Sequence, residues 1–258
     1  MYQIKATSNS QALVIFLLDV SGTMGKPFGG GTRIQVVQNA LKMTITQMVQ
    51  YSLKNKEIRP RYKVAMIAYS DDVFDILSGI QTIDVVAKKG IPKLEPLNRT
   101  DTTKGLKYVK KILDQEKRNI TKANPAPLVI HMTDGDYTST EDPEPVVREI
   151  QNIIVDDGPV LMANLFVSDE LKVSSAATAW PGYFRNDDLH NPYANRLLSF
   201  SSQLPDLYLE NIGELGYSIQ KGTVMMYPGV SPEFVQMAFI MGTASNGGGT
   251  EETKWEGE

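Results

Sequence analysis

The 258-residue chain contains no cysteine. Disulfide bonds, zinc sites built on thiolates and cysteine nucleophiles are therefore excluded. The histidines offer little in their place. His131 lies inside an apolar run, where a hydrogen-bonded core histidine is expected, and His190 lies in an irregular segment that gives it no role.

Long hydrophobic runs and an excess of positive charge are also missing. The apolar run at residues 12–18 is far shorter than the roughly 20 residues that span a bilayer. The first ten residues lack the basic-then-apolar order of a signal peptide, so a cytoplasmic location is expected. A net charge of -4 argues against binding to nucleic acid or to an anionic membrane.

Apolar runs rich in branched residues predict buried strands. The clearest are residues 12–18, 63–69, 128–133 and 160–167. Two of them stop abruptly at an aspartate, Asp19 and Asp134. Edge strands are expected within residues 73–83 and 222–227.

Helical spacing of apolar residues appears between these strands. It runs from Ile34 to Ser52 and Leu53, from Leu106 to Leu113, and beyond Ser231-Pro232. Asp142-Pro143-Glu144 is typical of a helix start, and the apolar residues that continue this predicted helix are Val146, Val147, Ile150 and Ile154.

Strands that alternate with helices predict an α/β fold, with a doubly wound, mostly parallel central sheet flanked by helices. We expect a single domain over residues 1–245, with an irregular segment and a short helix at residues 180–204. Residues 246–258 are rich in glycine and acidic residues, which predicts a flexible tail.

Three loops carry the candidate chemistry. Residues 19–24 (Asp-Val-Ser-Gly-Thr-Met) follow the first strand, residues 98–102 precede a helix, and residues 133–136 (Thr-Asp-Gly-Asp) follow the third strand. Ligands of doubly wound folds bind outside the carboxyl ends of the strands. Asp19 and Asp134 are therefore expected at one common edge.

Together these loops offer two carboxylates at strand ends, Asp19 and Asp134, and the hydroxyl groups of Ser21, Thr23 and Thr100. Mg²⁺ and similar ions prefer hard oxygen ligands in an octahedron and usually keep several waters. A site with few charged ligands leaves the ion electrophilic, so an incoming carboxylate is favoured as a further ligand.

The loops resemble the metal-ion-dependent adhesion site of von Willebrand factor A (VWA) domains. The family pattern Asp-x-Ser-x-Ser/Thr matches Asp19, Ser21 and Thr23, the family threonine matches Thr100, and the aspartate of the family Thr-Asp-Gly matches Asp134. The order and spacing match from residue 12 to residue 241. The short N-terminus resembles bacterial intracellular members of the family.

The resemblance implies the role of each residue. Ser21, Thr23 and Thr100 would touch one Mg²⁺, with Mn²⁺ or Ca²⁺ as alternatives, and Asp19 and Asp134 would act directly or through water. An Asp or Glu of a partner protein would complete the shell. The expected function is a binding module, an adaptor or scaffold and not an enzyme.

Four further residues lie near the site, and two of them depart from the family pattern. Asn98-Arg99 replaces the usual glycines before the threonine, which puts Arg99 in a position to tune partner choice. Asp101 and Asp136 are candidates to orient the ligand residues without contacting the metal themselves.

Two alternatives remain open. Asp19 after a buried strand is also typical of the nucleophile of haloacid-dehalogenase-like phosphatases, although Ser21 stands where those enzymes carry a second aspartate. The other alternative is a structural protein of the same fold without metal. A P-loop is excluded, because the lysine of Gly25-Lys26-Pro27 is not followed by Ser or Thr.

Overall fold

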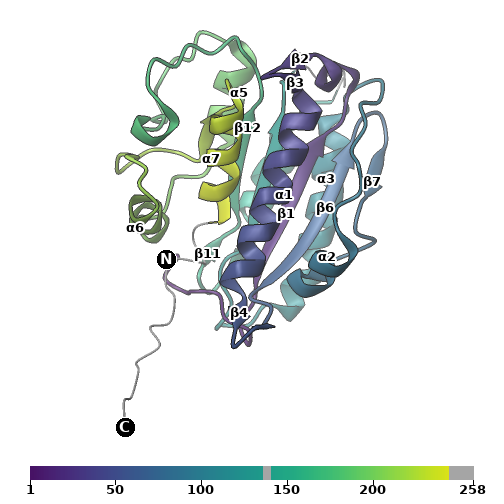
Figure 1. Cartoon of the computed structure of the whole chain (residues 1–258), viewed down its shortest axis with the longest axis vertical. Coiled ribbons are helices and arrows are strands. Elements are labelled where there is room, and N and C mark those ends of the chain that lie inside the picture. The colour runs from purple at the N-terminus through teal and green to yellow at the C-terminus, as the bar shows by residue number, and fades with distance from the viewer. Residues whose placement is uncertain (136–140, 244–258) are drawn as a thin grey trace.

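The central sheet of the molecule is mostly parallel. The computed structural model describes residues 1–135 and 141–243, and Figure 1 shows their arrangement. The strands of the sheet are β1 Ala12–Asp19, β6 Tyr62–Tyr69, β7 Val73–Asp75, β8 Gln81–Thr82, β9 Leu128–Thr133, β12 Leu161–Phe166 and β13 Met226–Pro228. Their order is β13-β12-β9-β1-β6-β7, with β8 also paired to β6. Only the pairs of β6 with β7 and β8 are antiparallel within this sheet, as described.

Helices cover both faces of this sheet. They are α1 Arg33–Tyr51, α2 Ile83–Lys89, α3 Thr102–Glu116, α4 Glu144–Gln151, α5 Pro192–Phe200, α6 Asp206–Glu214 and α7 Pro232–Thr243. One buried cluster joins the sheet to α1, α2 and α7, and a second joins it to α3, α4 and α5. Figure 1 shows α1 and α7 in front of the strands and α3 behind them. The predicted α/β fold is confirmed.

Short elements complete the chain. Among the described residues, 3₁₀ helices occur at η1 Gly22–Gly25, η2 Lys117–Asn119 and η3 Ala177–Ala179. Three small hairpins pair β2 Pro27–Phe28 with β3 Gly31–Thr32, β4 Leu53–Lys54 with β5 Glu57–Ile58, and β10 Ile154–Val155 with β11 Gly158–Pro159. In the part of the chain that is described, no helix is both long and apolar enough to cross a membrane.

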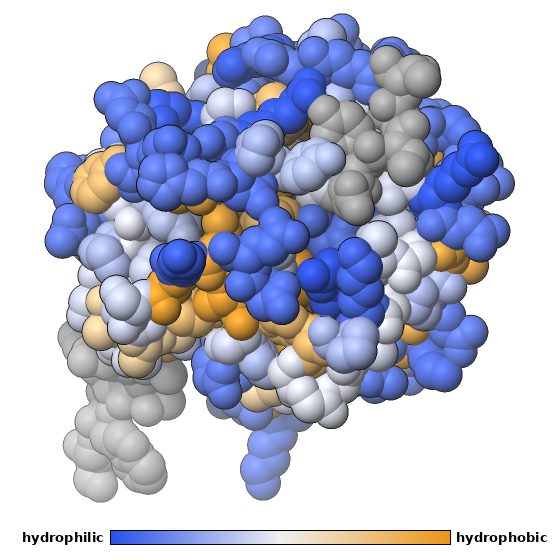
Figure 2. Space-filling model, turned by 90° about the horizontal axis from the view of Figure 1, so that it is seen from above, coloured by the Kyte–Doolittle hydropathy of each residue, from blue (hydrophilic) through white to orange (hydrophobic). Residues whose placement is uncertain are grey.

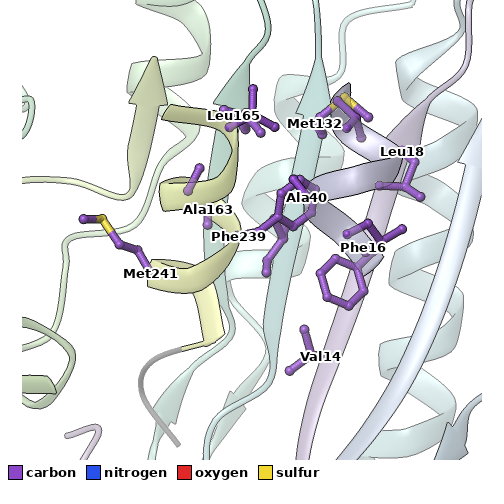
Figure 3. Packing of buried hydrophobic residues seen from close by; sticks show 14 of the residues in the cluster. Val14, Phe16, Leu18, Ala40, Met132, Ala163, Leu165, Phe239 and Met241 are labelled. Atoms are coloured by element: carbon purple, nitrogen blue, oxygen red, sulfur yellow. The ribbon is translucent and has the colours of Figure 1, made fainter. Parts of the chain in front are cut away.

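Strand β1 is buried on both faces, as its continuous apolar run predicts. Val14, Phe16 and Leu18 point toward α1 and α7, where the Phe16 and Phe239 rings lie 5.8 Å apart (Figure 3). The residues between them join the core on the other side of the sheet. Full burial of a side chain as large as Phe16 contributes about 2 kcal/mol. This strand is the rigid base from which Asp19 projects.

Two details differ from the sequence prediction. Helix α4 ends at Gln151, so Ile154 does not continue it and lies 60% exposed in β10. The buried Asp157 carboxylate accepts backbone hydrogen bonds from Gln3, Ile4 and Ala126, which fixes the β10–β11 hairpin there. Helices α2 and α6 had not been predicted. The short helix expected within residues 180–204 is α5, while the tail at 246–258 lies outside the described residues.

The strand order places a switch point beside β1. The chain adds β6 on one side of β1 and then β9, β12 and β13 on the other. Leu18 of β1 is paired with Met132 of β9, so Asp19 and Thr133 follow at the same end of the sheet. This is the crevice in which doubly wound folds bind ligands. The single-domain division at residue 245 stays a prediction.

Candidate metal centre

The first two candidate loops are bonded directly to each other. The backbone N–H of Gly22 donates to the carbonyl of Asn98 at 3.0 Å, and that of Leu97 donates to Val20 at 2.6 Å. A Cβ on Gly22 would lie 2.9 Å from the Leu97 carbonyl oxygen. The glycine in Asp-x-Ser-Gly-Thr is therefore required for the close approach of the two loops.

Asp19 occupies the centre of the site and is fully buried. Its Oδ1 accepts the Ser21 backbone N–H at 2.8 Å, and its Oδ2 accepts the Thr133 hydroxyl at 2.8 Å. Burial raises the pKa of Asp19 to about 7, and the nearby negative charge of Asp134 adds to the rise while the hydrogen bonds oppose it. A buried carboxylate with this environment is one that a cation would stabilise.

The hydroxyls of the first loop lie next to each other. Ser21 Oγ and Thr23 Oγ1 are 3.1 Å apart, with Ser21 buried and Thr23 partly exposed. The side chains of these two alternate residues thus reach the same side of the loop. The exposure of Thr23 opens this side of the site toward the surface.

Thr100 is placed by the start of α3 and is only 3% exposed. The residue after it, Asp101, caps this helix by accepting the Lys104 backbone N–H at 3.1 Å, and its own backbone N–H donates to Ser70 at 2.6 Å. Asp101 therefore anchors the loop that carries Thr100, while its supporting role at a metal site stays a prediction.

Asp134 is paired with Arg33, an arginine for which the sequence predicts no role. Arg33 Nη1 lies 2.7 Å from Asp134 Oδ2, and the side chains are 10% and 1% exposed, respectively. Arg33 is the first residue of α1, and Thr32 and Gln35 fix this helix end through a capping box. Nothing local in the sequence could have shown the pair, because its partners are 101 residues apart.

The glycine after Asp134 has a structural role of its own. Gly135 has a φ of +86°, and a Cβ there would lie 2.5 Å from a ring carbon of Phe166. Its backbone N–H donates to Thr133 Oγ1 at 2.9 Å. The Thr-Asp-Gly sequence thus sets the turn that presents Asp134. Asp136, the other expected supporting residue, lies outside the described residues.

A buried polar chain continues from the site into the core. His131 lies 2.8 Å from the Tyr69 hydroxyl through Nε2 and 3.0 Å from Asn164 Oδ1 through Nδ1. Burial lowers the pKa of His131 to about 4, which keeps the ring neutral, and it raises the pKa of Tyr69. The prediction of a satisfied core histidine is confirmed.

The donor set is suited to a hard divalent cation. Among residues 1–135 and 141–243, no three His, Asp or Glu side chains form a metal-binding group. The loops instead combine two buried carboxylates with hydroxyls, all of them oxygen donors of the kind that Mg²⁺ prefers. Figure 2 looks onto this end of the molecule, where hydrophilic residues dominate and hydrophobic ones appear in a narrow hollow near the middle.

Comparison with solved structures gives the fold. The PilB minor pilin from Streptococcus sanguinis matches 89% of this chain at 12% identity and a TM-score of 0.51, and the match covers 60% of the pilin. BatB from Bacteroides thetaiotaomicron matches 60% of this chain at 19% identity and a TM-score of 0.40, with 66% of BatB covered. The chain thus spans less than two thirds of either protein.

A third structure is named for an occupied site. It is proximal thread matrix protein 1 from the mussel byssus, whose metal-ion-dependent adhesion site (MIDAS) motif is occupied by zinc. Its identity to this chain is 16% and its TM-score is 0.42. The match covers 63% of this chain and 39% of that one. No curated protein sequence matches the chain.

The sequence itself matches a family over its N-terminal half. Residues 14–136 fit the profile of the von Willebrand factor type A domain. This stretch runs from β1 to the loop after β9 and contains all five candidate ligands. The profile match and the parallel sheet together support a von Willebrand factor type A domain in this chain.

Proposed function

We propose that this chain is a protein-binding module that depends on a divalent metal ion. Asp19, Ser21, Thr23, Thr100 and Asp134 would hold one Mg²⁺, or Mn²⁺ or Ca²⁺ in its place, and an Asp or Glu of a partner protein would complete the shell. One observation carries the proposal: a fully buried carboxylate, Asp19, lies where three hydroxyl-bearing loops meet.

The residues divide the work between holding and opening the site. Asp19 is fixed through both oxygens, and Asp101 anchors the loop of Thr100, so these donors are preorganised. Thr23 borders the open side. A bound dication with few charged ligands would supply an electrophilic site that favours a carboxylate. The proposed role of the module is that of an adaptor or scaffold.

The phosphatase alternative finds less support than the binding module. Those enzymes carry a second aspartate, as acid and base, two residues after the nucleophile. In this chain that position is Ser21, whose hydroxyl does not replace a carboxyl group in this role. VWA domains are generally interaction modules, which agrees with the same reading.

The metal-free alternative has one specific observation in its favour. Arg33 already places a positive charge 2.7 Å from Asp134, so part of the negative charge of the site is neutralised without any metal. Direct measurement of metal binding separates the two proposals. The cytoplasmic location also stays a proposal. The pilin shares the fold, but its 12% identity is too low to extend its role to this chain.

Binding of Mn²⁺, measured as the loss of the EPR signal of the free ion, tests the metal site. The wild-type protein should bind one Mn²⁺ per chain, and Mg²⁺ should displace it. Asp19→Ala should abolish this binding, and Thr23→Ala should weaken it. Asp114→Asn, an exposed position on α3 paired with Lys110, is the matched control and should bind as the wild type does. A wild-type protein that leaves the Mn²⁺ signal unchanged would refute the metal site.

Carboxylate capture needs a second measurement. Protein-bound Mn²⁺ should enhance the nuclear relaxation of acetate, used as a minimal carboxylate probe, and EDTA should abolish the effect. Acetamide, which has the same shape but no charge, is the control ligand. Equal enhancement for acetate and acetamide would leave the metal site in place and overturn the capture of a carboxylate.

A further inference from the structure

Arg33 is built into the site as a fixed cation. Its guanidinium lies 2.7 Å from Asp134 through Nη1 and 3.6 Å from Asp169 through Nη2. The Arg33 side chain is 10% exposed, and its Nε is buried without a hydrogen-bond partner in the described residues. Arg33 is thus held by the bond from Nη1 to Asp134, while its buried Nε is a polar group that calls for an explanation.

Position and charge show what holds it. Arg33 begins α1, and the capping box of Thr32 and Gln35 fixes the backbone from which its side chain extends. The partner at the inner end is the buried Asp134, whereas Asp169 at the outer end is 79% exposed. The guanidinium thus lies between a candidate metal ligand and the surface from which a partner would approach.

We propose that Arg33 is a specificity-determining residue. It lowers the affinity of the site for the metal ion and raises the affinity of the metal-loaded site for a carboxylate. This inference rests on the proposed function. With Asp19 and Asp134 ionised, the two buried carboxylates carry a charge of -2, which a dication alone would cancel. Arg33 leaves the buried groups of the metal-loaded site with a net charge of +1, since Asp169 is 79% exposed and its charge is screened by solvent. That buried positive charge attracts an acidic side chain.

The proposal has two consequences of opposite sign. Repulsion between Arg33 and a dication at the same carboxylate lowers metal affinity. An incoming carboxylate instead meets two cations, and a guanidinium can present two parallel N–H donors to it. The Nη2 nitrogen, 3.6 Å from the exposed Asp169, is the donor on the surface side. If Arg33 had only a structural role, its replacement would not tighten metal binding while weakening carboxylate binding.

The test compares wild type, Arg33→Gln and Arg33→Lys. Mn²⁺ affinity is measured by EPR, and acetate affinity is measured by relaxation at saturating Mn²⁺. Arg33→Gln should bind Mn²⁺ on the order of tenfold more tightly, because unit charges a few ångströms apart interact strongly near a protein surface. The same variant should bind acetate several-fold more weakly. Arg33→Lys keeps the positive charge but lacks the two parallel N–H donors of the guanidinium. Its change in Mn²⁺ affinity should therefore be smaller than that of Arg33→Gln.

The outcomes separate this inference from the proposed function. If the wild type and Arg33→Gln bind Mn²⁺ equally, or the variant binds it more weakly, the inference is overturned and the metal site stands. If neither binds Mn²⁺, both are overturned. Weaker acetate binding with tighter Mn²⁺ binding supports the inference.

A measurement on the wild type keeps the inference testable if Arg33→Gln does not fold. Mg²⁺ should shift the Arg33 Nε–Hε resonance, because the ion and the guanidinium share Asp134. A resonance that stays in place while Mg²⁺ binds would overturn the inference.

Discussion

Thr133 donates its hydroxyl to Oδ2 of Asp19 at 2.8 Å, and this bond joins the carboxyl ends of β9 and β1. The same oxygen of Thr133 accepts the Gly135 backbone N–H at 2.9 Å. One threonine therefore holds the buried carboxylate of the first loop and also shapes the turn that presents Asp134. The geometry of both acidic residues depends on it.

Thr133→Val should destabilise the protein and weaken the site together. The substitution preserves shape but leaves a buried carboxylate oxygen and a backbone N–H without this partner, which costs about 1–3 kcal/mol. Urea unfolding measures the loss. Thr133→Ser keeps the hydroxyl and is the control, and its stability should lie well above that of the valine variant. Equal stability of the two variants would show that the hydroxyl contributes nothing.

The pKa of Asp19 predicts a contribution to stability that falls with rising pH. The pKa is raised from 3.8 to about 7 in the folded chain. Between these values the folded state binds more protons than the unfolded state, so this contribution is present at low pH and is lost as pH rises from about 4 to about 7. Its full size is roughly 4 kcal/mol, since one pKa unit corresponds to about 1.4 kcal/mol.

Asp19→Asn, measured in EDTA, removes that contribution. The stability of the wild type relative to this variant should therefore decrease between pH 4 and pH 7, as followed by urea unfolding at each pH. A difference that stays constant over this window would mean that Asp19 ionises normally.

His131 acts with the opposite sign. Its pKa is lowered from 6.5 to about 4 by burial, so the folded state binds fewer protons than the unfolded state between these values. Its contribution is complete above about pH 6.5 and is lost as pH falls toward 4. The full size is roughly 3 kcal/mol. His131→Gln should flatten the acid side of the stability curve relative to wild type, and an unchanged acid side would contradict this.

The fold and the meeting of the loops could be predicted because they depend on local patterns. The apolar run of β1 predicted a strand buried on both faces, and its abrupt end at Asp19 placed a carboxylate at the sheet edge. Parallel strands put such ends side by side, so Asp134 followed from the same rule. The structure brings the loops of Asp19, Thr100 and Asp134 together, while their role as metal ligands stays a prediction.

Other features could not be predicted, because they depend on contacts between distant residues. The pairing of Arg33 with Asp134 requires the end of β9 and the start of α1 to be placed in three dimensions. Ile154 fits the helical spacing of α4, yet the helix ends earlier because Asp157 binds backbone groups near the N-terminus and at Ala126. Helical periodicity carries no information about such competing tertiary bonds.

Metal affinity should depend on pH through Asp19. Metal ligands must be deprotonated, so binding competes with the proton on a carboxylate whose pKa is about 7. Mn²⁺ affinity should therefore fall by about tenfold for each pH unit below 7. EPR titrations at pH 5, 6, 7 and 8 measure this slope. An affinity independent of pH between 5 and 7 would exclude Asp19 as the group that titrates with binding.

Gly22→Ala tests whether the contact between the first two loops serves the metal site. The added Cβ would meet the Leu97 carbonyl oxygen at 2.9 Å and that of Asn98 at 3.1 Å. Both contacts are with backbone, which cannot turn aside as a side chain can, so the loops must separate. Overpacking of this kind destabilises by about 1–3 kcal/mol. Separation would also move Thr100 away from Ser21, so Mn²⁺ affinity should fall as well.

Gly213→Ala is the matched control. Gly213 lies in α6, and a Cβ there would meet nothing within 4 Å. Alanine is favoured over glycine in a helix, so this variant should be as stable as the wild type or slightly more stable. Thermal melts and Mn²⁺ titrations on both variants separate the effects. If Gly22→Ala loses stability but keeps full Mn²⁺ affinity, the second loop does not supply a ligand, and Thr100 leaves the site.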